Sequence, residues 1–215
     1  AKMFEGYSDA LVIRHELEGV SKFISDIVDV PVINAGDGAG QHPTQTLLDL
    51  YTIKKEIGEI DNLKIALIGD LKFGRTVHSL LMAMRFFNPT FNFVAPKELR
   101  MPEQYIDYCK KHNIPFRELE DMNEILKETD ILYMTRVQQE RFTDLVEYEK
   151  VKNTYTLHNS MLDGSKDNLR ILHPLPRVNE ISEDVDENPK AYYFEQARNG
   201  VYARQAVICD ILGLV

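Results

Sequence analysis

The sequence predicts an α/β protein with two doubly wound parallel-sheet domains that are bridged by long helices. Apolar runs rich in β-branched residues alternate along the chain with segments of helical periodicity, which is typical of parallel strands flanked by helices. Two of the helical segments, 43–57 and 193–212, are long enough to connect one half of the molecule to the other. The 215 residues suffice for one large domain or two small ones.

The predicted strands are short apolar runs that end at polar or turn-forming residues. All of them contain valine, isoleucine or leucine, and half also contain an aromatic residue, which are residues that strands favour. The segments are 10–13, 31–33, 64–68, 91–95, 114–118, 131–135, 154–157 and 170–172. The segment EIGEIDN, which follows the first long helix, is the best candidate for a domain junction.

The predicted helices are identified by their ends and by one apolar face. Pro43 suits the first position of a helix, and Gly58 suits its end. The segment 76–87 places Val77, Leu80, Leu81 and Met84 on one face at helical spacing. The other predicted helices are 103–112, 122–129, 145–152 and 193–212.

Composition excludes several classes of function. The net charge of −9 disfavours binding to nucleic acid or to an anionic membrane surface. No apolar run approaches the roughly 20 residues of a membrane helix, and no signal peptide is recognisable. Cys109 and Cys209 lie in helical patterns without CxxC or metal-ligand spacing, so we expect free thiols, a reducing cytoplasm and no metal ion or other cofactor.

Polar and cationic residues follow the predicted strands. Arg14, the loop 34–42, Arg75, Arg136 and the segment 173–177 each come after one of them. Open parallel sheets bind ligands beyond the carboxyl ends of their strands. A single arginine at a strand end has about even odds of being structural, but five such ends predict one pocket for anionic substrates.

The loop NAGDGAGQHPTQT combines three glycines with His42, Pro43 and Gln45. Glycines permit close approach of a ligand to the backbone, and the helix that begins at Pro43 offers free N–H groups to an anion. His42 and Gln45 are three residues apart at the start of that helix, so both can face one ligand. The alternative is a plain turn with a histidine beside a helix.

The segment GDLKFGRT, residues 69–76, nearly matches a nucleotide phosphate loop, with Arg75 in place of the lysine. The charge of Asp70 would oppose a polyphosphate there, and no convincing metal-binding acid follows a later strand. We therefore disfavour nucleotide hydrolysis. A guanidinium suits bidentate recognition of a carboxylate.

Two further segments carry candidate binding residues. Arg136 and Gln138 are two residues apart in TRVQQER, so in an extended chain they point the same way, although the segment could also be a charged surface loop. In HPLPR, Pro174 and Pro176 flank Leu175 and stiffen a backbone whose carbonyls could accept hydrogen bonds from an NH₂ group. The Leu175–Pro176 bond could be cis.

Together these segments resemble the aspartate/ornithine carbamoyltransferase family. The match includes RHELEG, NAGDGAGQHPTQTLLDL, GDLKFGRTVHSL, ILYMTRVQQER, HPLPRV and NGVYARQA, in the family's order and over essentially the whole chain. Ornithine enzymes typically carry HCLP where this chain has His173 to Pro176, which favours aspartate as the second substrate.

The resemblance implies roles for particular residues. Arg14 and His42 would be catalytic, polarising the carbonyl oxygen of carbamoyl phosphate. The residues implied to bind carbamoyl phosphate are Arg14, His42, Gln45, Pro174 and Leu175, and those implied to bind L-aspartate are Arg75, Arg136 and Gln138. The resemblance further implies a cytoplasmic homotrimer of catalytic chains, with or without regulatory chains. Residues 1–57 and 194–215 would form the remainder of a truncated carbamoyl-phosphate-binding domain, and 58–193 the aspartate-binding domain.

Two parts of the family pattern do not occur in this sequence. The upstream Ser-Thr-Arg-Thr-Arg phosphate segment and a later loop with a serine and a lysine are missing, and the chain opens at Ala1 as if cut from a longer protein. We therefore expect the 215-residue chain alone to be inactive or nearly so, and poorly stable. The alternative is a non-catalytic aspartate-binding or assembly module derived from the family.

Overall fold

The computed structural model describes residues 1–38, 40–137, 142 and 145–215. The chain begins with a small parallel sheet of two strands, β1 (Leu11–His15) and β2 (Val32–Asp37). Two short helices that the sequence did not predict, α1 (Lys2–Glu5) and α2 (Val20–Ser25), accompany this sheet. The long helix α3 (Pro43–Ile57) then leads to the second, larger sheet.

The larger sheet has five parallel strands in the order β5-β4-β3-β6-β7. Their bounds are β3 (Lys64–Ile68), β4 (Thr90–Val94), β5 (Phe116–Leu119), β6 (Ile131–Met134) and β7 (Arg170–Leu172). From β3 the chain builds outward to β5, then returns to the other side of β3 and builds β6 and β7. The strand order therefore reverses between β3 and β6, which is the point where open α/β sheets bind ligands.

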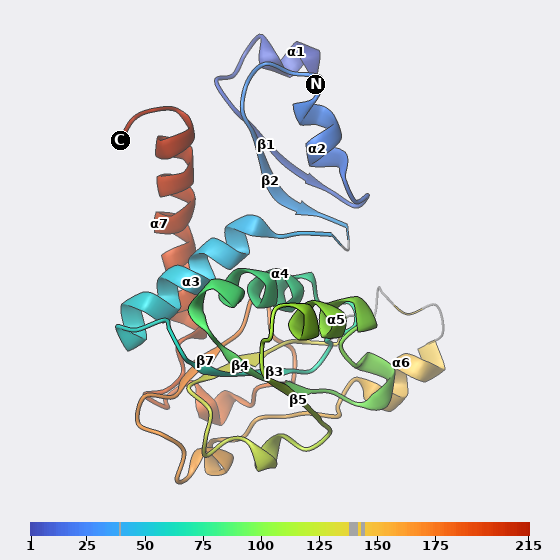
Figure 1. The fold of residues 1–215 in the computed structure, drawn as a ribbon, viewed down its shortest axis with the longest axis vertical. Helices are drawn as coiled ribbons and strands as arrows, with labels where there is room; N and C mark the ends of the chain where they lie inside the picture. The colour runs from blue at the N-terminus through green and yellow to red at the C-terminus, as the bar shows by residue number, and fades with distance from the viewer. Residues whose placement is uncertain (39, 138–141, 143–144) are drawn as a thin grey trace.

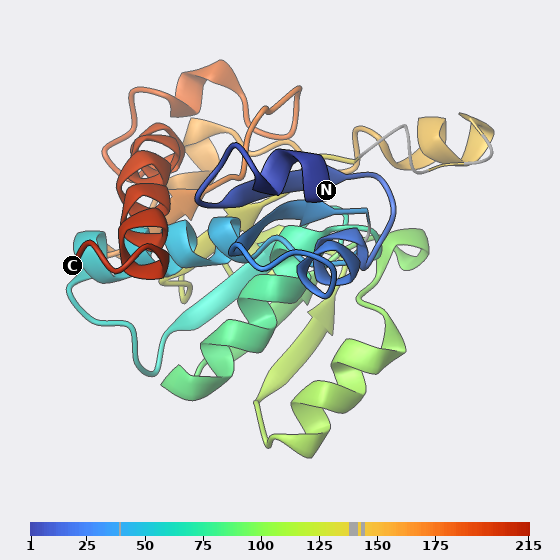
Figure 2. The same ribbon diagram turned by 90° about the horizontal axis from the view of Figure 1, so that it is seen from above.

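Helices cover the larger sheet and connect it to the smaller one. In Figure 1, α3, α4 (Arg75–Met84) and α5 (Glu103–Lys111) lie over one face, with the two-stranded sheet beyond them. The long helix α7 (Tyr193–Ile211) lies beside α3, while α6 (Leu145–Val151) projects at the opposite end of the molecule, as Figure 2 shows from above. No described helix is long and apolar enough to cross a membrane.

Side chains alternate between the two faces of the larger sheet, and each face has its own core. In β3, Ile65 and Leu67 pack with α3, α4 and α5, whereas Ala66 and Ile68 pack on the opposite face. The opposite face is covered mainly by loops and short 3₁₀ turns, which lie at Met122–Glu124, Asn159–Leu162 and Glu183–Val185. Burial of the strands on both faces explains their nearly continuous apolar sequences.

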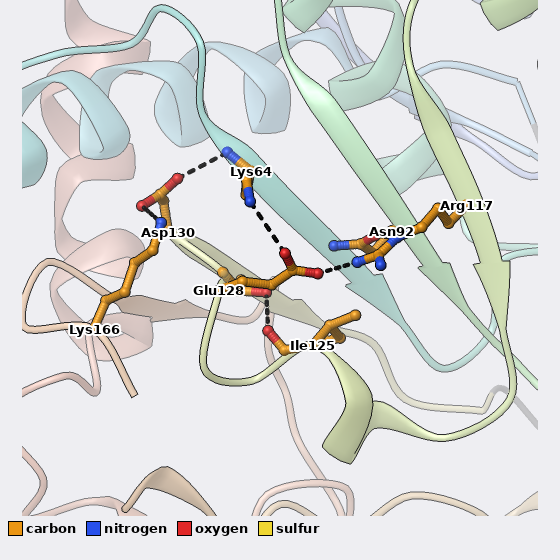
Figure 3. A network of polar contacts seen from close by, with 8 residues as sticks. Lys64, Asn92, Arg117, Ile125, Glu128, Asp130 and Lys166 are labelled. Atoms are coloured by element: carbon orange, nitrogen blue, oxygen red, sulfur yellow. Dashed lines mark hydrogen bonds and ion pairs between the residues drawn. The ribbon is translucent and has the colours of Figure 1, made fainter. Parts of the chain in front are cut away.

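The amino ends of the central strands are closed by an ionic network (Figure 3). The Lys64 N–H donates to Asp130 Oδ2 at 2.9 Å, while its ammonium group pairs with Glu128 at 3.0 Å. Arg117 of β5 also pairs with Glu128, and Lys166 pairs with Asp130 at 2.8 Å. These contacts lie at the opposite ends of the strands from the cavity described below.

Two predicted elements are wrong. Residues 154–157 form no strand, because Leu157 pairs its backbone with Glu180 and Ser182 outside the large sheet and reaches the core from there. Residues 122–129 form only a single 3₁₀ turn at Met122–Glu124 followed by turns. The apolar side chains of that segment are buried as a helical face would be, so the pattern predicted the burial but not the backbone.

The other predicted elements agree with the structure within a few residues. The largest shifts are the extension of the second strand to Asp37 and the end of the α-helix α4 at Met84, where a 3₁₀ turn continues to Phe87. The first strand extends to His15, so Arg14 lies within β1 rather than beyond it.

Candidate active site at the carboxyl ends of the strands

A cavity of about 170 Å³ lies between the two sheets, at the carboxyl ends of the large sheet's strands. The residues that line it are Arg14, His42, Gln45, Asp70, Gly74, Arg75, Thr76, Thr135, Arg136, His173, Pro174, Leu175 and Pro176. The structure thus brings together seven of the eight predicted site residues. The eighth, Gln138, lies outside the described residues.

The floor of the cavity is the switch point between β3 and β6. The Asp70 N–H donates to Thr135 Oγ1 at 2.9 Å, and the same hydroxyl donates to the Ile68 carbonyl at 2.9 Å. These bonds join the end of β3 to the end of β6. They place Asp70, which is 1% exposed, and Arg136 at one edge of the sheet.

The loop 69–74 is shaped by its own carboxylate. Asp70 Oδ1 accepts a hydrogen bond from the Phe73 N–H at 2.9 Å, which closes a turn just before α4 begins at Arg75. The carboxylate occupies the interior of the loop, where a phosphate loop would hold its anion. This geometry agrees with the argument against a polyphosphate ligand.

Arg75 is held against two glycines, Gly36 near the end of β2 and Gly38 in the loop that follows β2. Its Nη1 donates to the Gly38 carbonyl at 2.8 Å. Gly36 has φ of +115°, and a Cβ there would lie 3.1 to 3.2 Å from the guanidinium atoms of Arg75. Glycine at this position therefore lets the guanidinium lie flat on the backbone. The contact ties α4 of the large sheet to β2 of the small one.

His42 precedes α3 and is positioned by α4. Its N–H donates to Ser79 Oγ at 3.3 Å, and its carbonyl accepts the Gln45 N–H at 3.0 Å. Burial, followed by the positive charges of Arg75, Arg14 and Arg204, lowers the pKa of the imidazole from 6.5 to about 4. The ring is therefore neutral near pH 7. Its buried Nδ1 has no hydrogen-bond partner among the described residues, which fits a ring that meets a ligand.

The lowered pKa of His42 predicts a pH-dependent contribution to stability. The unfolded chain binds a proton at this ring below about pH 6.5, but the folded chain does so only near pH 4. The contribution of the neutral ring is therefore complete above pH 6.5 and is lost as the pH falls from 6.5 towards 4. We expect His42→Gln to lose less stability than wild type between pH 7 and pH 5 in urea unfolding. Parallel curves for the two proteins would contradict the expectation.

The segment after β7 is fixed by a buried histidine. The Leu175 N–H donates to His173 Nδ1 at 2.8 Å, so His173 Nε2 carries the proton and donates to Glu180 Oε1 at 2.7 Å. Leu175 has φ of +52°, in the left-handed region, and the Leu175–Pro176 bond is cis. Glu180, which is 5% exposed, also accepts the Val178 and Asn179 N–H groups. This network gives the segment one backbone conformation.

Some residues at the cavity are not those that the sequence singled out. Thr76, Thr135 and His173 line it, although the sequence assigns them no role. Thr76 closes the segment GDLKFGRT, Thr135 ends a predicted strand and His173 directly follows another. Arg177, at the end of the HPLPR segment, does not line the cavity, because it pairs with Asp186 and contacts Tyr193.

Comparisons with known proteins bear on the family. The family model described as aspartate/ornithine carbamoyltransferase, carbamoyl-P binding domain, matches residues 1–55, and the Asp/Orn binding domain of the same enzymes matches residues 61–211. The aspartate carbamoyltransferase catalytic subunit of Bacteroides fragilis is 64% identical over 213 residues, which cover 99% of this chain and 69% of that protein. The corresponding subunit of Methanobrevibacter smithii is 64% identical, with 99% and 67% covered.

Solved structures agree with these relatives. The catalytic subunit of M. jannaschii aspartate transcarbamoylase is similar with a TM-score of 0.91 and 49% identity, covering 99% of this chain and 69% of that one. Aspartate transcarbamoylase from Trypanosoma cruzi, in complex with carbamoyl phosphate and aspartate, is similar with a TM-score of 0.90 and 37% identity over 96% and 68% of the two chains.

Proposed function

The chain belongs to the aspartate/ornithine carbamoyltransferase family, and from that premise we propose that it transfers the carbamoyl group of carbamoyl phosphate to the amino group of L-aspartate. The products are N-carbamoyl-L-aspartate and phosphate, as in pyrimidine biosynthesis. The observation that carries the proposal is the convergence of Arg14, Arg75, Arg136 and a neutral His42 on one cavity. This set suits two small anions, one of which carries two carboxylates.

The aspartate half of the site would be formed by the large sheet. Arg75 begins α4, and Arg136 follows β6. Both residues therefore line the cavity at the same edge of the large sheet. Two guanidinium groups match the two carboxylates of aspartate, because each can form paired N–H bonds to one planar anion. Gln138 is proposed as a third ligand on sequence grounds.

The carbamoyl phosphate half would be formed by β1, the start of α3 and the segment after β7. Arg14 and a neutral His42 would donate hydrogen bonds to the carbonyl oxygen, where negative charge develops as the amine attacks. Gln45 and the backbone carbonyls of Pro174 and Leu175 would bind the carbamoyl NH₂ group. No side chain need form a covalent bond, since the departing phosphate can accept the proton of the amine.

We propose the same division of the chain as the sequence suggested, with 1–57 and 194–215 as one domain and 58–193 as the other. Packing of α7 against α3 supports it: Lys55 pairs with Glu195 at 3.1 Å, and Asn199 donates to Thr52 at 3.1 Å. A cytoplasmic homotrimer is proposed from family membership. The free thiols of Cys109 and Cys209 suit a reducing compartment.

Binding of N-(phosphonacetyl)-L-aspartate, the compound bound in a similar T. cruzi structure, tests the proposal. At about 100 times its Kd, a ligand stabilises the folded state by about 2.7 kcal/mol, which corresponds to a rise in Tm of roughly 5–10 °C for a chain of this size. Differential scanning fluorimetry should show that rise. A response to succinate alone, without one to the bisubstrate compound, would instead favour the non-catalytic aspartate-binding module. No response to either compound would contradict the proposal.

A further inference from the structure

A buried carboxylate beneath the cavity accepts hydrogen bonds from three elements. Asp49 of α3 is 0% exposed. Its Oδ1 accepts from Gln45 Nε2 at 3.0 Å and from Gln196 Nε2 of α7 at 2.6 Å, while its Oδ2 accepts from the Tyr133 hydroxyl of β6 at 2.8 Å. Burial raises the pKa of Asp49 to about 7, against the opposing effect of these three bonds and of the Arg204 charge.

The hydrogen bonds continue from Asp49 to the far side of the cavity. Gln196, which is 1% exposed, accepts the His173 N–H on its Oε1 at 2.8 Å. His173 Nδ1 in turn accepts the Leu175 N–H at 2.8 Å. A line of direct contacts therefore joins Gln45, at the start of α3, to Leu175, after β7.

Asp49 sets the direction of two bonds in this line, those from Gln45 and Gln196. The other two are donated by the backbone N–H groups of His173 and Leu175. Asp49 Oδ1 accepts two N–H groups and therefore stays an acceptor whether or not Oδ2 carries a proton, whereas a glutamine amide can turn over and present either its oxygen or its NH₂ group. Because Asp49 binds the Nε2 atoms of Gln45 and Gln196, it fixes both amides. The Oε1 of Gln196 is thereby turned to the His173 N–H, and the Oε1 of Gln45 is the oxygen that remains for a donor in the cavity.

We propose that Asp49 is a positioning residue that orients Gln45 directly, and the Leu175 backbone through Gln196 and His173, so that both face the carbamoyl NH₂ group as acceptors. This inference rests on the proposed function, since it assigns Gln45 and Leu175 to that group. Asp49 does not itself line the cavity. Its effect on the reaction is exerted entirely through the orientation of its partners.

The variant Asp49→Asn tests the proposal with little change in shape. At the Oδ1 position its NH₂ group would meet the NH₂ groups of Gln45 and Gln196, so that at least one amide must turn over. At the Oδ2 position it would require the Tyr133 hydroxyl to turn and accept. Because the 215-residue chain alone is expected to be inactive or nearly so, the kinetic measurements here and below are made on the complete catalytic chain that contains these residues. There we expect the KM for carbamoyl phosphate to rise at least tenfold, with a change of less than about threefold in the KM for aspartate at saturating carbamoyl phosphate. Gln196→Met, which removes the link to His173 and leaves Asp49 in place, should raise the same KM.

The matched control is Thr52→Val, one helical turn along α3. It breaks the buried Asn199–Thr52 hydrogen bond across the same α3–α7 contact, but neither residue lines the cavity. We expect it to lower Tm as Asp49→Asn does while leaving both KM values unchanged. A rise in the carbamoyl phosphate KM as large in Thr52→Val as in Asp49→Asn would reduce Asp49 to a structural role and overturn the proposal.

A double-mutant cycle with Gln45→Ala provides the second readout. If Asp49 acts partly through Gln45, Asp49→Asn should cost less in the Gln45→Ala background than in wild type. Additive losses would contradict the proposed route. Failure of wild type to bind N-(phosphonacetyl)-L-aspartate would instead remove the proposed function itself. Asp49→Asn with wild-type KM values, in a protein that binds the compound, would overturn this inference alone.

Discussion

Replacing Arg136 by alanine is expected to lower kcat/KM for aspartate by at least about 10²-fold, while the affinity for carbamoyl phosphate changes little. Arg136 directly follows β6 at the switch point of the sheet and lines the cavity. A guanidinium that donates two hydrogen bonds to one carboxylate contributes several kcal/mol to transition-state binding when the contact is shielded from water. Steady-state kinetics with each substrate varied in turn measures the effect.

Two further variants make the result specific. Arg136→Lys keeps the charge but loses the planar fork, so we expect at least a tenfold loss. Arg100→Ala removes an exposed arginine that pairs with Glu120 at 2.7 Å. Neither residue lines the cavity. That control should stay within about twofold of wild type. Wild-type KM for aspartate in Arg136→Ala would refute the assignment of this residue to the aspartate half.

The fold was predictable because the strands are buried on both faces. In a chain where strands and helices alternate, a short apolar run such as 64–68 indicates a buried strand, and β3 occupies those residues. The two wrong elements, 154–157 and 122–129, have apolar residues at strand or helix spacing, and these residues are wholly or partly buried without forming a strand or an α-helix. Leu157 is fully buried through an isolated bridge, and Ile125 is buried from a turn, so tertiary contacts replaced the strand and the helix that local pattern indicated.

The cavity could be predicted in part because parallel strands end at one edge. That rule required only that Arg75 and Arg136 follow strands, which the sequence shows directly. That rule does not identify the buried residues that hold the cavity residues in place. Asp49 lies in the middle of a helical pattern where a carboxylate normally faces water, and only the approach of Gln196 from 147 residues away reveals its role. No local signal encodes such a pair.

The switch point also places a severe steric demand on one residue. Gly69 follows β3 with φ of +111°, and a Cβ there would lie 2.3 Å from the Thr135 carbonyl oxygen and 2.7 Å from its hydroxyl. Both are atoms of the segment that carries Arg136. The close approach of β3 and β6 at the cavity floor therefore depends on the absence of a side chain at position 69.

Gly69→Ala is accordingly expected to lower the free energy of unfolding by about 3–5 kcal/mol, since the strain of a positive φ adds to a backbone clash. Gly58→Ala separates the two contributions. Gly58 has φ of +83° but nothing within 4 Å of its Cβ position, so its substitution should cost only about 1–2 kcal/mol. Urea unfolding of both variants measures the difference. Equal losses would mean that β6 moves aside without cost, and the Arg136 guanidinium would then owe its position to the loop after β6 rather than to the contact between the two strands.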